Sequence, residues 1–399
     1  MATGSAERMR RWQGPAVLSF GFRPFFLFGA LWAALAMLAW IGMLGGHLAL
    51  PSRFDPLSWH AHEFLFGYLG AILAGFLLTA VPNWTGRLPV VGWQLGGLFG
   101  LWLLGRGAVA VSAALPAAVA IAADLAFPLV LGALVLREIV AGRNWRNLIV
   151  LALVVAFTLA NLIFHLEAAR GAAAAQGYGL RLGLATALMM ISVIGGRIVP
   201  SFTRNWLVRE GARALPAPPM QRFDRVVLLA SVVLLLLWVG WPEARASGLG
   251  LIVLGVMHAL RLARWEGRQT GREALVWVLH AGYAFVPLGA LAMGLATLWP
   301  GLVLPAGVQH LWMAGAIGLM TLAVMTRATL GHTGRALHAG RGTRLIYAAL
   351  IASVLARLAA AFWPLMALYH LAAGLWMLAF LGYVALYGPL LVRRAPGGG

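Results

Sequence analysis

The sequence contains no cysteine and no lysine, and it is poor in charge of either sign. Without cysteine the chain cannot form disulfides, iron–sulfur clusters, thiolate-ligated haem sites or cysteine-type zinc sites, so any metal would need histidine, methionine or carboxylate ligands. Only 10% of the 399 residues are charged and 62% are hydrophobic, whereas about a quarter of a typical soluble chain is charged. This composition excludes a soluble enzyme and a disordered protein.

The few charges are mostly basic. Thirty arginines stand against 11 acidic residues, which gives a formal net charge of +19. Nucleic-acid-binding proteins concentrate such cations on one solvated face, but here the arginines are scattered between apolar runs much longer than a buried strand. A lipid bilayer therefore explains the basic charge better than a nucleic acid does.

The apolar runs predict an all-α, polytopic membrane protein. A membrane-spanning helix needs about 20 mostly apolar residues, and twelve such segments form a single integral membrane domain over residues 1–399. The longest connection, from Pro200 to Gln221, is too short to fold alone. The segments are predicted to begin near Phe25, His60, Val90, Pro116, Trp145, Gly179, Phe223, Ser247, Glu273, Pro305, Thr343 and Leu365.

The arginines also predict the orientation, because short cytoplasmic loops carry an excess of basic residues. When the loops are assigned alternately to the two sides, 24 of the 30 arginines fall on one side. We therefore predict that both termini are cytoplasmic. The arginines on this side include Arg8, Arg10, Arg11, Arg87 and Arg261.

A short pattern recurs at the cytoplasmic ends of the second, sixth and tenth predicted helices. These ends have the sequences VPNWTGR (81–87), VPSFTRNW (199–206) and MTRATLGHTGR (325–335). A recurrence every four helices suggests three four-helix units. Membrane interfaces also select threonine, arginine and tryptophan, so this second explanation stays open.

Several histidines are predicted to lie at one depth. At a helix rise of about 1.5 Å per residue, four of them lie roughly 8 to 10 Å below the outer surface, on the second, fifth, tenth and twelfth helices. Histidine is common at interfaces, but ionisable groups inside spans are costly and indicate function. The layer therefore predicts a metal or cofactor site. Its members are His62, His165, His310 and His370, with His47 and His60 just above them.

A second pair, His258 on the eighth helix and His280 on the ninth, lies at a similar depth from the inner surface and can meet across adjacent antiparallel helices. His60 and His62 are two positions apart, about 200° around a helix, so they cannot share one metal unless the first turn is irregular. Glu63 is expected to carry protons or to orient a neighbouring ligand; the alternative is an interfacial carboxylate with an arginine neighbour.

Two arginines, Arg106 and Arg357, fall within predicted spans, where an unpaired arginine costs about 2.5 to 3.5 kcal/mol. Haem propionates would compensate them, although Asp124 on the fourth helix could instead pair with Arg106. Imidazole ligands without thiolate suit haem iron and copper.

Several motifs give the sequence a recognisable family resemblance. It resembles the NnrS family of bacterial inner-membrane proteins that contain haem and copper. The matching stretches are GFRPFF (21–26), WHAHEFLFG (59–67), AGFLLTAVPNWTGR (74–87), NLIFHLE (161–167), GGRIVPSFTRNWL (195–207), the segments around His258 and His280, and AGAIGLMTLAVMTRATLGHTGR (314–335).

The resemblance implies haem and copper bound in a twelve-helix protein of nitric oxide metabolism, which protects bacteria against nitrosative stress during denitrification. His370 and His47 lie outside the matched motifs and rest on depth alone, and His332 falls in a predicted cytoplasmic loop. A fold-level analogy with the haem–copper oxidase and nitric oxide reductase subunit is weaker, because the sixth helix here has no histidine. The positions carried over from the family are His60, His62, His165, His258, His280, His310 and His332.

The resulting hypothesis is a protein with one or two haem b groups and copper that binds nitric oxide near the outer surface and reduces or otherwise transforms it. Enzymatic activity and the electron donor are left open. The alternatives are a secondary transporter, for which twelve repeated spans are common, and a non-catalytic haem or copper carrier or sensor. The expected haem ligands are His62 and His310, with His258 and His280 for a second haem, Arg106 and Arg357 for propionates, His60, His165 and His370 near copper, and Glu63 and His60 in catalysis.

Overall fold

The computed structural model describes residues 12–85 and 89–394, and these residues form helices joined by short connections, with no β-strand among them. Among the described residues, eleven helical segments are long and apolar enough to cross a membrane, and α5 (Trp93–Ala110), at the position of the third predicted span, is a twelfth helix that is less apolar than these. Two polar residues, Gln94 and Arg106, lower the hydropathy of α5. The predicted all-α architecture is confirmed, and the chain is a multi-pass membrane protein. Arg8, Arg10, Arg11 and Arg87 lie outside the described residues.

Every span begins within four residues of its predicted start. Hydropathy locates these helices well because each spans the same apolar thickness. In chain order the other eleven are α2 (Phe22–Leu44); α3 (Pro56–His62) continued by η2 (Glu63–Tyr68) and α4 (Leu69–Thr85); α6 (Ala117–Ala141); α7 (Leu148–Ala169); α8 (Tyr178–Met190) continued by η6 (Ile191–Gly195) and α9 (Gly196–Arg209); α10 (Arg222–Gly240); α11 (Arg245–Ala263); α12 (Ala274–Leu298); α13 (Pro305–His310) continued by η8 (Leu311–Leu319) and α14 (Met320–His332); α15 (Arg341–Phe362); and α16 (Met366–Val392).

Within the described residues, π-helix occurs in three spans, as η2, η6 and η8. A π-helix interrupts the regular i→i−4 bonding of an α-helix and is often found at functional sites. The three spans are the second, sixth and tenth, whose cytoplasmic ends share the sequence recurrence. The recurrence therefore has a counterpart in the backbone.

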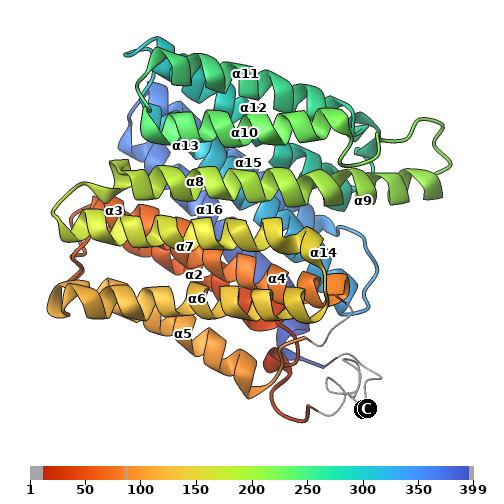
Figure 1. Cartoon of the computed structure of the whole chain (residues 1–399), viewed down its shortest axis with the longest axis horizontal. Helices are drawn as coiled ribbons and strands as arrows, with labels where there is room; N and C mark the ends of the chain where they lie inside the picture. Colours follow the sequence, from red (N-terminus) through yellow and green to blue (C-terminus); the bar gives the residue numbers. More distant parts are fainter. Residues whose placement is uncertain (1–11, 86–88, 395–399) are drawn as a thin grey trace. The chain divides into compact units, whose positions relative to one another are not determined.

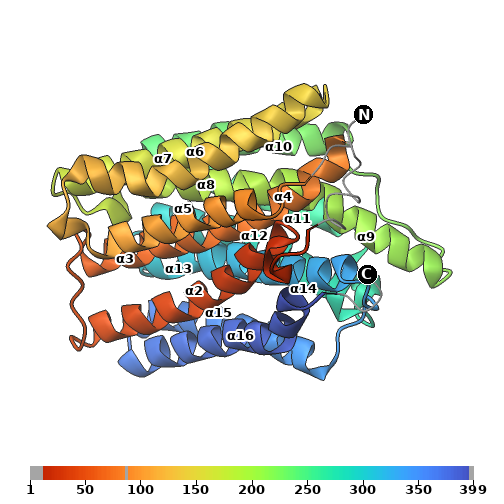
Figure 2. The ribbon, with the colours of Figure 1, turned by 90° about the horizontal axis from the view of Figure 1, so that it is seen from below.

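The sixth span is longer than the sequence predicts. Figure 1 and Figure 2 show α8 running directly into α9 as one continuous helix, which passes Pro200 and ends at Arg209. The prediction of an irregular connection from Pro200 is thus wrong at its first ten residues. A proline removes one backbone donor but does not end a helix when neighbouring groups satisfy the freed carbonyl.

Contacts between helices divide the chain into two compact units. The first comprises the chain up to Gly183, together with Ala328–Arg335 and the residues from Phe380 onward, and the second comprises Leu184–Arg327 and Ala336–Ala379. In the first unit α5, α6 and α7 lie side by side (Figure 1), and α2 packs against α4 and η2. In the second unit α11 packs against both α10 and α12, and η8 packs against α12 and α15.

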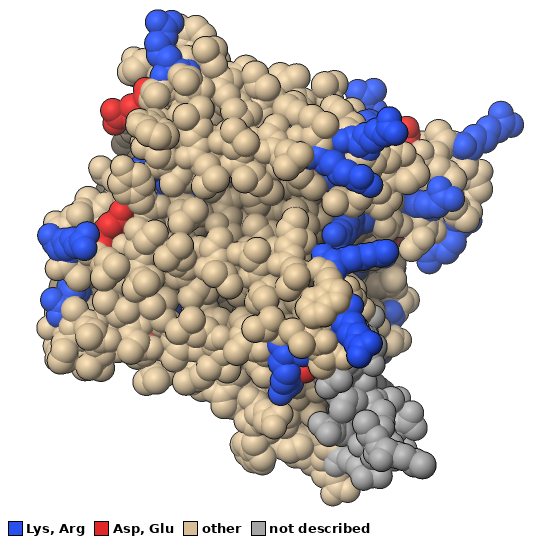
Figure 3. Space-filling view, viewed as in Figure 1, with Lys and Arg blue, Asp and Glu red and all other residues tan. Residues whose placement is uncertain are grey.

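Large apolar side chains lie on the outside of the spans in both units. Leu129, Val155 and Leu229 are 59%, 58% and 68% exposed, respectively. Figure 3 shows a wide uncharged surface along the helices and arginine side chains at helix ends. Large exposed apolar patches are rare on soluble proteins, so this surface fits the hydrocarbon part of a bilayer.

The first unit joins the start of α2 to the end of α16. Arg23 is buried, and its Nη1 donates to the backbone carbonyls of Leu390, Leu391 and Arg393 at 3.3, 2.9 and 2.8 Å. The last carbonyls of a helix have no partner within it and carry partial negative charge. The guanidinium therefore caps α16 with a side chain from the first span.

Candidate metal centre

The second span begins with a strong capping arrangement. The carboxylate of Asp55 accepts hydrogen bonds from two backbone N–H groups of the first turn, both at 3.0 Å, and Pro56 occupies the first helical position. This start fixes the directions of the two histidines that follow. His60 stacks on Trp40 with 4.5 Å between ring centroids, whereas His62 is fully buried and contacts α7. The two rings point to different partners, as their spacing predicts.

Both ring nitrogens of His62 contact polar side chains. Nδ1 donates to Glu63 Oε1 at 3.0 Å, and Nε2 lies 2.9 Å from Asn161 Oδ1 and 3.2 Å from Asp124 Oδ2. Neither His62 nor Glu63 has any exposed surface. A carboxylate on one nitrogen fixes the tautomer and orientation of a ring whose other nitrogen binds a metal. Glu63 is thus placed to orient His62, and it is fully buried within the protein.

Arg106 joins the two carboxylates of the site. Its Nη1 donates to Glu63 Oε1 at 2.6 Å, and its Nη2 pairs with Asp124 Oδ1. Trp32 Nε1 donates to the second oxygen of Glu63 at 2.8 Å. The sequence leaves open whether a propionate or Asp124 compensates Arg106, and the structure pairs this arginine with Asp124 and also with Glu63.

A glycine of the π-helix makes room for this arginine. A Cβ atom at Gly67 would clash with Arg106 Nη1 and would lie 2.9 Å from Glu63 Oε2. Trp102 of α5 also donates to the backbone carbonyl of Gly67 at 3.0 Å. The close approach of α5 to η2 therefore depends on the missing side chain at position 67.

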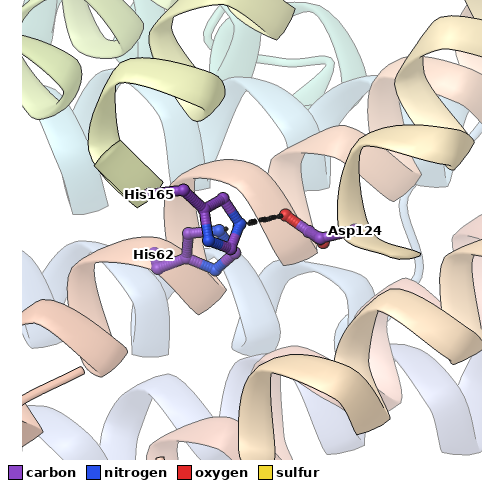
Figure 4. Close-up of side chains that lie close together, drawn as sticks. All are labelled: His62, Asp124 and His165. Atoms are coloured by element: carbon purple, nitrogen blue, oxygen red, sulfur yellow. Dashed lines mark hydrogen bonds and ion pairs between the residues drawn. The ribbon is translucent and has the colours of Figure 1, made fainter. Parts of the chain in front are cut away.

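Asp124 of α6 connects the two histidines. Its Oδ2 lies 3.0 Å from His165 Nε2 and accepts a hydrogen bond from Asn161 Nδ2 at 2.8 Å. Figure 4 shows the rings of His62 and His165 close together beside this carboxylate. His62, Asp124 and His165 each offer one ligand atom, these atoms lie within 4.8 Å of one another, and all three residues are buried.

The donor set fits a divalent transition metal. Two imidazole nitrogens and a carboxylate oxygen suit copper, iron and zinc. Because a ligand must present a lone pair, a metal would replace the protons that now lie between the rings and Asp124. The charge also fits: when His62 gives up its Nε2 proton to present a lone pair, two carboxylates face a single guanidinium, and a bound cation balances the remaining negative charge.

The other outer histidines have separate surroundings. His310 is half-buried on α13, and its Nδ1 donates to a backbone carbonyl one turn earlier at 2.6 Å, which makes Nε2 the basic nitrogen. His370 is exposed on α16, so it does not belong to the buried cluster. Arg357 lies over the ring of Tyr369, 5.0 Å from its centroid. Depth alone therefore does not bring the predicted residues together.

His332 is not in a loop, contrary to the prediction. It is the last residue of α14, and its ring lies 5.6 Å from that of Phe20 and 5.4 Å from that of Phe22. The helix thus continues beyond its apolar run to a residue whose ring contacts two phenylalanines.

A comparison with protein-family models matches residues 16–394 to the NnrS protein model. The chain belongs to the NnrS family. No curated protein matches the chain. Membership supports a general role in the nitric oxide response, and the NnrS family is generally linked to haem and metal binding. The resemblance drawn from the motifs is thus confirmed over nearly the whole chain.

In this NnrS family member, His258 and His280 each have their own partners. The Tyr283 hydroxyl donates to His258 Nδ1 at 2.8 Å, and His258 Nε2 donates to Ser231 Oγ at 3.0 Å. His280 Nε2 contacts the hydroxyl of Thr203 at 2.7 Å. Both nitrogens of His258 are therefore used within the protein, and a shared haem at this pair stays a prediction.

Arg261 is a correction to the predicted topology. It lies inside α11 and is fully buried, whereas the sequence predicts a loop. It donates to Asp224 Oδ1 at 2.8 Å, to the backbone carbonyl of Ser192 at 2.8 Å and to the Tyr283 hydroxyl at 3.0 Å. The carboxylate of Asp224 and the backbone carbonyl of Ser192 in η6 compensate the charge of Arg261. This pairing allows α11 to continue past the end of its apolar run.

Arg261 also depends on a glycine, and this gives a testable packing prediction. A Cβ atom at Gly196 would clash with its Nη2, whereas the nearest neighbour of a Cβ at Gly195 lies at 3.7 Å. We expect Gly196→Ala to lower the free energy of unfolding by about 1 to 3 kcal/mol, as overpacking does in cores. Unfolding in mixed detergent micelles measures this, with Gly195→Ala as the matched control. Equal stability of the two variants would contradict the tight fit.

The sequence does not identify the roles of two residues of the candidate site, Asp124 and Asn161. The sequence predicts Asp124 only as a counterion for Arg106, and it gives no role to Asn161, which donates to Asp124 in the structure. The sequence does contain a signal for Asn161: it stands four residues before His165, so the two side chains share one face of an otherwise apolar helix.

Proposed function

We propose that the protein binds copper at His62, His165 and Asp124, and that nitric oxide binds at this centre. The supporting observation is the convergence of two imidazole nitrogens and one carboxylate oxygen within 4.8 Å in a buried position. We also propose that the chain acts as one integral domain in the bacterial cytoplasmic membrane, with both termini in the cytoplasm. A cupric or cuprous centre is suited to imidazole and carboxylate ligands.

Haem b is the second proposed cofactor. His310 is its proposed ligand because a backbone carbonyl holds the proton on Nδ1 and leaves Nε2 as the basic nitrogen. We assign His62 to copper rather than to haem because it contacts the same carboxylate as His165. The roles predicted from the sequence for His60, His258, His280, His332, His370, Arg106 and Arg357 toward these cofactors stay predictions.

Copper bound here would supply a redox-active centre for nitric oxide. Around it, Glu63 holds the Nδ1 proton of His62, and Asn161 holds the carboxylate of Asp124. Arg106 keeps both carboxylates in fixed positions, so the site needs little rearrangement when charge changes at its centre. Trp32 completes the hydrogen bonding of Glu63 and keeps this carboxylate turned toward His62.

The transporter alternative uses Arg106 and Asp124 as contacts for a substrate. In the structure these two side chains pair with each other and are 5% and 2% exposed. The geometry therefore favours a fixed polar centre as the role of these residues.

The proposal is tested by metal analysis and spectroscopy of the purified full-length protein in lipid nanodiscs. We expect about one bound copper per chain and a cupric electron paramagnetic resonance spectrum with couplings to two imidazole nitrogens. Failure to take up copper, or a spectrum without nitrogen couplings, would refute the copper site. Absorbance of haem in the same sample is recorded separately, so the two cofactors are judged independently.

The hydrogen bond from His62 to Glu63 makes a second prediction. Glu63→Gln keeps the shape of the side chain but removes the negative charge at Nδ1. We expect the copper affinity to fall roughly 10- to 100-fold, the usual effect of removing such an orienting partner. Competition titration with a chelator measures the affinity. Glu138→Gln, a buried carboxylate beside Arg137 on the same unit, is the control, and an equal loss there would contradict the assignment.

A further inference from the structure

In the first unit, a narrow pocket lies against the candidate metal centre. Its inner end is formed by Arg106, Asp124 and Asn161. Toward the outside it is lined by Pro128 of α6 and Thr158 of α7, which are half-buried. The pocket thus lies between a buried polar cluster and half-buried side chains of α6 and α7.

The wall between these two ends is apolar. Its side chains are at most 7% exposed and contain no hydrogen-bonding group. The cavity volume is about 10 Å³, which is the lower limit for holding a single molecule of the size of water. The pocket therefore suits a diatomic molecule, and its apolar wall offers no group to solvate an ion. The apolar side chains are Phe66, Leu73, Phe127, Leu131, Val154 and Phe157.

The sequence of α6 weakens this helix beside the pocket. Pro128 stands four residues after Asp124 and has no N–H group, so it cannot donate the regular helical hydrogen bond to the Asp124 carbonyl. A proline in a helix also displaces the preceding turn, because its ring clashes with that carbonyl. The backbone carbonyl of the residue that would ligate the metal therefore lacks its regular helical donor.

The surface around the outer end faces lipid. Leu129, Val155 and Leu159 beside it are 59%, 58% and 49% exposed, and both α6 and α7 are candidate membrane spans. An uncharged, weakly polar diatomic gas is favoured in hydrocarbon over water, because it makes no strong hydrogen bonds that water could satisfy. Its local concentration is therefore higher at this opening than at an aqueous one.

We propose that this pocket is the route by which nitric oxide enters the metal centre directly from the hydrocarbon part of the bilayer. The route admits small uncharged diatomic molecules and excludes ions and larger solutes. The identity of the metal at its inner end rests on the proposed function, whereas the route rests on the pocket itself. Ionic ligands of the centre must arrive by another path.

The route is tested by filling the pocket with one larger side chain. Val154→Phe places an aromatic ring on the pocket wall, and Val155→Phe places the same ring on the neighbouring lipid-facing position as the control. With copper-loaded protein in nanodiscs, we expect Val154→Phe to slow nitric oxide association by at least roughly tenfold, which corresponds to about 1.4 kcal/mol in the barrier. Val155→Phe should leave the rate unchanged, and azide binding to cupric protein should be unchanged in both variants.

A second measurement needs no metal. Dissolved oxygen is a paramagnetic diatomic gas, so it should enhance the relaxation of the labelled methyl groups of Leu73 and Leu131 in metal-free protein, and Val154→Phe should remove this enhancement. If copper does not bind, the proposed function fails while the oxygen measurement still decides the route. An unchanged nitric oxide rate in Val154→Phe, an equal slowing in Val155→Phe, or a parallel loss of azide binding would each overturn the route.

Discussion

Replacement of Arg106 by methionine is expected to destabilise the protein by about 3 to 5 kcal/mol, the usual effect of removing one partner from a buried ion pair. The change leaves Glu63 and Asp124 without their shared cation in a site where all three side chains are at most 5% exposed. Unfolding in mixed micelles at increasing detergent fraction measures the loss. Methionine has a length similar to the arginine stem, so the difference reports mainly the charge.

Arg146→Met is the matched control for this experiment, because Arg146 is exposed just before α7. Its stability should stay within about 0.5 kcal/mol of the wild type, as for most surface substitutions. If copper binds as proposed, its addition should stabilise Arg106→Met more than the wild type, since the cation then stands against two uncompensated carboxylates. A variant as stable as Arg146→Met would show that the buried pairing contributes nothing.

Replacement of His165 by alanine should abolish stoichiometric copper binding. This ring supplies one of the three converging ligand atoms, and loss of a ligand should exceed the roughly 10- to 100-fold effect of losing an orienting partner. Metal analysis after dialysis against a weak chelator gives the stoichiometry. The cupric spectrum of any residual metal should lose the couplings of one imidazole.

In the same assay, His370→Ala tests whether copper binding requires a histidine within the buried cluster or only a histidine at the same depth in the membrane. His370 is predicted at the depth of His165 but is exposed on α16, so copper binding should be unchanged. Loss of copper in His370→Ala with retention in His165→Ala would refute the proposed ligand set. Circular dichroism of both variants confirms that the helices are intact.

The spans could be predicted from the sequence because membrane thickness imposes a length and an apolar composition on each of them. The cap at Asp55 and the divergence of His60 and His62 follow from local rules of helix geometry. These properties depend on residues within about one turn of each other. They need no knowledge of which helices are neighbours.

The partners of the histidines could not be predicted in the same way. Residue spacing gives depth, which is one coordinate, but not the direction in which a side chain points. His165 and His370 have similar predicted depths, yet one contacts Asp124 and the other is exposed. The choice is made by the packing of α6 against α7, which no local pattern specifies.

The sequence places Arg261 in a loop for a related reason, although it lies inside α11. A buried arginine needs acceptors, and its acceptors come from Asp224 on another helix and from a carbonyl in η6. A π-helix of this kind has no composition that distinguishes it from an α-helix in an apolar run. The sequence recurrence at the three spans indicated where these segments lie, but not what they are.

The contact between Arg23 and the end of α16 can form only when both ends of the chain have been synthesised. The two contacting segments are 368 residues apart in the chain, and at roughly 5 to 20 residues per second the ribosome needs on the order of 20 to 70 s to synthesise that length. During this interval the guanidinium must find other acceptors, among them lipid headgroups or water. The first unit can therefore reach its final form only after the last span has been synthesised, although most of its helices are made first.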